Sequence, residues 1–96
     1  MMAGVSDTTE RDRWHVDDRW YAVTMTSVVS HLNRDGMALE LEDVGPSPGR
    51  GLVLEAFYDD DTGHMSLTSS TTEPLPIPLV EAFIAEVRRR LPPTER

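Results

Sequence analysis

The chain of 96 residues has no cysteine and no lysine, and these absences exclude several kinds of chemistry. Without cysteine there is no disulfide bond, no thiolate nucleophile and no zinc–thiolate site. Without lysine there is no Schiff-base chemistry and no desolvated amine base. Long apolar runs are also missing, because no stretch approaches the roughly 18 consecutive apolar residues of a membrane span. We therefore predict that the protein has no membrane partner.

Positive charge is scarce as well. Nine arginines face 17 aspartates and glutamates, and the formal net charge is −8 with the histidines neutral. Nucleic-acid binding requires clustered cations that neutralise phosphates, so this balance argues against a nucleic-acid partner. The acidity is concentrated in residues 34–61, where two arginines and eight carboxylates account for −6 of the total. The first residues lack an apolar run behind a basic region, which predicts a cytoplasmic protein without a secretory signal.

Length and composition predict one small domain between two loose ends. Residues 1–13 are mostly small or charged and are expected to form a disordered N-terminal arm. Residues 92–96 begin with two prolines and are expected to form a flexible C-terminal tail. The predicted domain is then residues 14–91, which have room for a single core.

The segment Leu79–Leu91 has the clearest pattern of the chain. Its apolar residues recur at steps of three and four, which is typical of one face of a helix: Val80, Phe83, Ile84, Val87 and Leu91. Pro78 suits the start of a helix, and Pro92 prevents its continuation. We predict a C-terminal helix.

Three segments before this helix have the composition of antiparallel strands: residues 37–44, 52–58 and 64–70. Asp59–Gly63 would close the hairpin between the last two, and the glycine- and proline-rich residues 45–51 would join the first two. Strict alternation directs one set of hairpin residues to the core: Leu52, Leu54, Ala56, Tyr58, Met65 and Leu67. The opposite face would then carry Val53, Glu55 and Phe57 beside Glu40 and Glu42 of the preceding strand.

Residues 19–33 give conflicting signals. Their apolar side chains fall on one side of a helical wheel, whereas their many Val and Thr residues favour a strand. The periodicity leads us to predict an α+β domain with a three-stranded antiparallel sheet and an N-terminal and a C-terminal helix packed on one face. The alternative is a four-stranded antiparallel meander with the C-terminal helix alone.

Asp59, Asp60, Asp61 and His64 form the stretch that most resembles a metal site, because carboxylates and an imidazole stand close together. Aspartate and glycine are also the residues that a hairpin turn prefers for conformational reasons. The bidentate glutamate that ends a calcium loop is missing, since the twelfth position counted from Asp59 is Ser70. A plain turn is the favoured interpretation, and a divalent-metal-responsive domain is the alternative.

The rest of the sequence favours binding over catalysis. No nucleophile and base have a recognisable spacing, so we predict a protein that is not an enzyme and has no cofactor. Apolar anchors in a charged surround are typical of protein interfaces. We predict an acidic interaction module that docks a basic or partly apolar protein surface, or a second copy as a homodimer. The candidate interface residues are Trp14, Trp20, Glu40, Glu42, Val53, Glu55 and Phe57.

Overall fold

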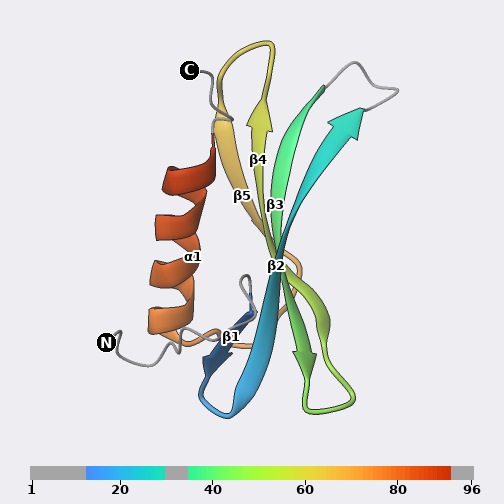
Figure 1. Cartoon of the computed structure of the whole chain (residues 1–96), viewed down its shortest axis with the longest axis vertical. Coiled ribbons are helices and arrows are strands. Elements are labelled where there is room, and N and C mark those ends of the chain that lie inside the picture. The colour runs from blue at the N-terminus through green and yellow to red at the C-terminus, as the bar shows by residue number, and fades with distance from the viewer. Residues whose placement is uncertain (1–12, 30–34, 92–96) are drawn as a thin grey trace.

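The computed structural model describes residues 13–29 and 35–91, which form one antiparallel sheet and one helix (Figure 1). The elements, in chain order, are β1 (Arg13–Val16), β2 (Arg19–Val29), β3 (Asp35–Gly45), β4 (Gly51–Asp59), β5 (Met65–Ser69) and α1 (Ile77–Arg90). The five strands pair in sequence order as a meander. The predicted arm and tail lie outside the described residues, except Arg13, which begins β1.

The structure corrects the predicted fold, because it has five strands and, among the described residues, no N-terminal helix. Residues 19–29 form β2, which pairs with β3 from Trp20 to Val29. Pairing along a whole neighbouring strand outweighs the local helical periodicity, and the Val and Thr residues suit a pleated surface. The four-stranded alternative comes closer but lacks β1.

A two-residue turn joins β1 to β2 and was missed at the level of sequence. Asp17 and Asp18 both adopt left-handed backbone conformations, with φ of 51° and 67°. Two consecutive positive φ angles give the tight turn whose twist matches that of an antiparallel hairpin. Aspartate tolerates this conformation better than most residues, although glycine is the usual choice.

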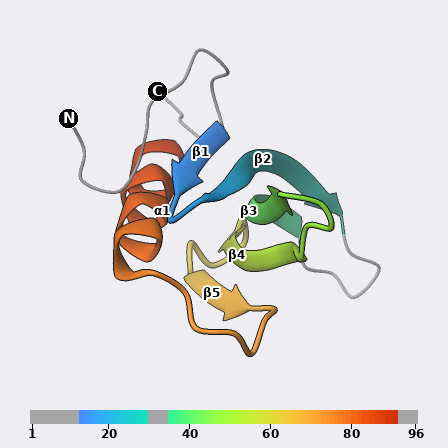
Figure 2. The same ribbon diagram turned by 90° about the horizontal axis from the view of Figure 1, so that it is seen from below.

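The sheet curls around α1, which lies on its concave side between β1 and β5 (Figure 2). The predicted C-terminal helix is confirmed, and it buries Leu79, Phe83 and Val87 against the sheet. The sheet contributes the following buried apolar residues to the same core: Val16, Tyr21, Val23, Leu39, Leu41, Val53, Leu54 and Ala56. No helix within the described ranges is long and apolar enough to cross a membrane.

A bulge between β3 and β4 changes which face each residue of β4 occupies. Leu41 pairs with Leu54, but Glu42 pairs with Leu52, so Val53 is an extra residue between them. Val53 and Leu54 are therefore both buried, whereas Leu52 turns outward. The prediction that Val53 faces away from the core is wrong, because it assumed strict alternation along the strand.

Candidate functional site

The sheet face that points away from α1, here called the open face, carries most of the predicted interface. Cross-strand pairing places Glu40 directly opposite Glu55, and Glu42 opposite Leu52. Phe57 lies two residues further along β4, opposite Ala38. No element in the described part of the chain covers this group, although residues 1–12, 30–34 and 92–96 are not placed.

The three glutamates of the open face make no ion pair with any residue that the structure describes. Glu42 is exposed, and Glu40 and Glu55 are half-buried. Like charges directly opposite on neighbouring strands destabilise a sheet. The Glu40–Glu55 pair therefore opposes folding, because neither carboxylate has an ion-pair partner in the part of the chain that the structure describes.

Phe57 places an aromatic side chain next to the Glu40–Glu55 pair. Its side chain is half-buried and lies against Gly36, where an added Cβ would come within 2.9 Å of the phenyl ring. Ala38, its cross-strand partner, is fully buried although it points away from α1. Leu52, which sequence analysis assigned to the core, is 36% exposed on this same face.

The two tryptophans lie on opposite sides of the sheet. Trp14 pairs with Tyr21 and packs against the core on the concave side. Trp20 pairs with His15 on the open face, and their rings stack with centroids 4.7 Å apart. Only Trp20 of the two is therefore placed to contact a partner on the open face.

The acidic hairpin is a turn in which one carboxylate holds the backbone. Asp59 is buried, and its carboxylate accepts hydrogen bonds from the backbone N–H groups of Asp61 at 2.9 Å and Thr62 at 3.3 Å. The loop is closed by Gly63, whose φ is 75° and whose N–H donates to the Asp59 carbonyl. Asp60, Asp61 and His64 are exposed, and no group of three potential metal ligands gathers anywhere in the described ranges.

A buried carboxylate network that sequence analysis missed lies at one end of the sheet. Asp43 is 1% exposed and accepts hydrogen bonds from Arg19 Nε at 2.8 Å and Arg50 Nε at 2.6 Å. It also accepts one from the backbone N–H of Gly45. Arg19 Nη2 donates in addition to the carbonyl oxygens of Pro46 and Pro48, which ties the β3–β4 connection to β2.

The network places one carboxylate between two guanidinium groups. Burial by itself would raise the pKa of Asp43, but the hydrogen bonds and charges of Arg19 and Arg50 lower that pKa below its ordinary value. Burial and the nearby Asp43 charge raise the pKa of Tyr21, whose hydroxyl accepts a hydrogen bond from Arg50 at 3.5 Å. A general acid or base needs a pKa near the working pH. The lowered pKa of Asp43 therefore suits an ion pair that stabilises the structure and does not suit proton transfer.

One feature of the sequence indicated that Asp43 would need a partner. Asp43 continues the alternation of Leu39 and Leu41, so it shares their core-facing side of β3. A charged residue at a core position needs a partner. The partners could not be named from sequence, because Arg19 lies 24 residues away and Arg50 lies in a connection.

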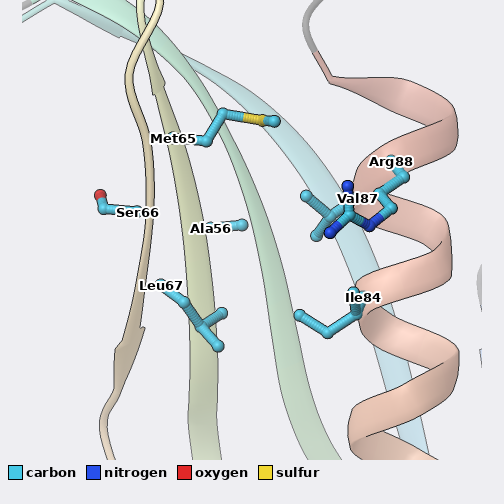
Figure 3. A pocket seen from close by; sticks show the side chains of 7 residues that line it. All are labelled: Ala56, Met65, Ser66, Leu67, Ile84, Val87 and Arg88. Carbon is cyan, nitrogen blue, oxygen red and sulfur yellow. The ribbon is translucent and has the colours of Figure 1, made fainter.

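A groove of about 200 Å³ runs between β5 and α1 (Figure 3). Its lining is mostly apolar: Ala56, Met65, Leu67, Ile84 and Val87, with Ser66 and Arg88. Figure 3 shows Leu67 and Ile84 facing each other across it. Arg88 is the only ionisable residue of this lining, so the groove offers contact area and lacks an acid–base pair.

Searches against protein-family models, curated proteins and solved structures found no match for the chain.

Proposed function

We propose that the protein is a non-catalytic interaction module whose open face binds a basic, partly apolar surface of a partner protein. The observation that supports this most directly is the group of Glu40, Glu42 and Glu55, which lack an ion-pair partner among the described residues and lie beside the apolar side chains of Leu52 and Phe57. Such an arrangement opposes the stability of the free protein. A cationic partner would relieve the repulsion, so binding is favoured by the same charges that oppose folding.

Apolar side chains give this face contact area that charge alone would not supply. Phe57 is held against Gly36, and Leu52 projects beside Glu42. Aromatic side chains are enriched among the residues that dominate binding energy at protein interfaces. Because the Phe57 ring is already packed, little conformational entropy is lost when a partner covers it.

The net charge of −8 supports the same proposal at long range. A strongly acidic protein attracts a basic partner before contact, which raises the association rate at low ionic strength. The partner is therefore expected to be a protein with clustered arginine or lysine. No observation favours the metal-responsive alternative, since Asp59 uses its carboxylate to hold its own turn.

The experiment compares two variants that remove the same amount of charge. A Glu40→Gln/Glu55→Gln variant removes two carboxylates from the open face, and the control, Asp60→Asn/Asp61→Asn, removes two from the exposed hairpin tip. Each tagged protein is used to capture partners from its own cells, followed by mass spectrometry. We expect the open-face variant to lose basic partners that the control retains.

A direct titration complements the capture experiment. A synthetic peptide of alternating arginine and leucine is added to isotope-labelled protein, and amide chemical shifts are followed by NMR. The proposal expects saturable shifts centred on Glu40, Glu55 and Phe57, weakened by salt. Shifts confined to the hairpin tip, or identical captured proteins with both variants, would refute it.

A further inference from the structure

The outer edge of β5 carries backbone groups that no neighbouring strand uses. The His64 carbonyl accepts from the Asp59 N–H at 3.0 Å, and the Ser70 N–H donates to the Val53 carbonyl at 2.9 Å. Both even-numbered residues thus face β4, and backbone groups alternate in direction along an antiparallel strand. The N–H and C=O groups of Met65, Leu67 and Ser69 therefore point away from the sheet. Since β5 ends the strand order, no described strand pairs with them.

Two large apolar side chains of β5 are exposed. Met65 is 39% exposed and Leu67 is 47% exposed, and both line the groove that α1 borders (Figure 3). Native sheets normally protect an open edge with charge, proline or a covering element. The five residues of β5 contain neither charge nor proline. This edge has the properties of a surface that another chain covers.

The side of α1 that borders β5 continues this surface. Ile77, Glu81, Ile84 and Arg88 recur at steps of four, three and four residues, so they form one stripe along the helix. Ile84 and Arg88 line the groove, and Ile77 is 67% exposed. Glu81 and Arg88 are exposed and make no ion pair with another described residue.

We propose that a second copy of this chain covers the groove, forming a two-fold dimer in which β5 pairs antiparallel with β5 of the other subunit. With the axis at Leu67, Met65 lies opposite Ser69 of the partner subunit, and Leu67 lies opposite itself. All three residues with outward-facing backbone groups then find matching donors and acceptors. This self-complementarity is what a two-fold interface requires.

The same axis brings the two helices together with opposite charges in register. The two-fold axis of this strand pair is perpendicular to the sheet, which is also the direction in which strand side chains project. Leu67 and Ile84 face each other across the groove, so an axis at Leu67 passes close to Ile84 (Figure 3). Glu81 precedes Ile84 by three residues and Arg88 follows it by four, about 4.5 and 6 Å along the helix. In an antiparallel helix pair, Glu81 therefore meets Arg88 of the partner subunit twice, once on each side of the axis. This charge complementarity favours a second copy over an unrelated strand.

The dimer would bury Met65, Leu67 and Ile84 and leave both open faces accessible. It would join two five-stranded sheets into one, with both helices on the same side. Two identical acidic faces in one particle would bind a partner with repeated basic segments more tightly than either face alone. The dimer itself does not depend on the proposed function, since its interface lies on β5 and α1.

The test measures dimer dissociation by analytical ultracentrifugation up to about 100 μM protein. We expect the unmodified chain to dimerise and Glu81→Arg to weaken the dimer about tenfold or more, because two like-charged pairs replace two opposite ones. Arg88→Glu is expected to weaken it similarly. The exchange variant Glu81→Arg/Arg88→Glu is expected to restore dimerisation, which a loss of folding would not do.

Two further variants locate the strand contact. Leu67→Lys places two cations at the axis and is expected to abolish the dimer, whereas Thr68→Lys, one residue further and on the opposite face, is expected to weaken it little. Circular dichroism checks that both remain folded. Glu42→Arg controls for the charge change of Glu81→Arg and should leave the dimer intact. A monomer at all concentrations, or a dimer that the exchange variant does not restore, would overturn the proposal.

Discussion

Asp43 joins parts of the protein that are far apart in the sequence. Its carboxylate holds Arg19 of β2 and Arg50, which immediately precedes β4, while Arg19 also reaches the carbonyl oxygens of the β3–β4 connection. Burying an ion pair of this kind costs desolvation free energy, which offsets the attraction between the charges. Its presence alone is therefore weak evidence of net stability. Removing one member is different, because the remaining groups keep their burial and lose their partner.

Asp43→Asn is therefore expected to lower the free energy of unfolding by about 2 kcal/mol at neutral pH. This loss is smaller than is usual when a buried ion pair is broken. The Arg19 and Arg50 side chains are about 30% exposed, so water can hydrate their charges in part after the carboxylate is removed. Urea denaturation of both proteins measures the difference. Glu86→Gln is the control, since Glu86 pairs with Arg89 and Arg90 of its own helix and keeps 16% of its side chain exposed, so this change should lower the free energy of unfolding by only about 0.5 kcal/mol. Equal losses in the two variants would contradict the assignment.

The Arg19–Asp43–Arg50 network also predicts that the free energy of unfolding depends on pH. The pKa of Asp43 is lower in the folded protein than in the unfolded chain, where aspartate titrates near pH 3.9. Its stabilisation is complete above that pH and is lost as the pH falls through the folded-state pKa. The difference in unfolding free energy between the natural chain and Asp43→Asn should therefore shrink below about pH 4. A constant difference between pH 7 and pH 3 would argue against ionic pairing.

At the scale of the elements, one bulge determines what β4 presents on each face. Val53 is fully buried, whereas Leu52 is 36% exposed on the open face beside Glu42. Val53→Ser is expected to lower the free energy of unfolding by about 2 to 3 kcal/mol, because it removes core contacts and buries a hydroxyl. Leu52→Ser should change it by less than about 1 kcal/mol. If the two effects were reversed, the strict alternation assumed from sequence would be correct.

The β1–β2 turn offers a change that strengthens the fold. Asp18 has a φ of 67°, which glycine adopts without steric cost. Asp18→Gly is expected to raise the free energy of unfolding by about 0.5 kcal/mol, seen as a higher melting temperature. Asp60→Gly is the matched control and should be neutral or destabilising, because Asp60 is not among the described residues with positive φ. Stabilisation by both changes would indicate relief of acidic repulsion as the cause.

At the scale of the whole molecule, a net charge of −8 opposes the compact state. Salt screens repulsion between exposed carboxylates more than it screens the buried Asp43 network. Raising NaCl from about 20 mM to about 300 mM should therefore increase the melting temperature. Calorimetry measures this shift, and it should be smaller in Glu40→Gln/Glu55→Gln, which has already lost two of the repelling charges. A lower melting temperature in salt would mean that favourable ion pairs dominate.

Local patterns were sufficient where neighbours along the chain decide the structure. The stripe of α1, its basic last turn and the prolines around it predicted the helix, and the strands at residues 37–44, 52–58 and 64–70 are present. The aspartates and glycine of residues 59–63 close the hairpin between β4 and β5, as their composition predicted. The separation of the acidic glutamates from the core was also readable, because β3 alternates regularly over Leu39 to Asp43.

The remaining features depend on partners that are distant in sequence. Residues 19–29 carry both a helical and a strand pattern, and pairing with β3 and β1 decides between them. The bulge at Val53 arises from how β4 meets β3, so no property of β4 alone predicts it. Composition and local periodicity determined that this is a small acidic domain with a C-terminal helix. Only the tertiary structure decided the number of strands, the Arg19–Asp43–Arg50 network and the faces left open, because each results from contacts between residues far apart in the chain.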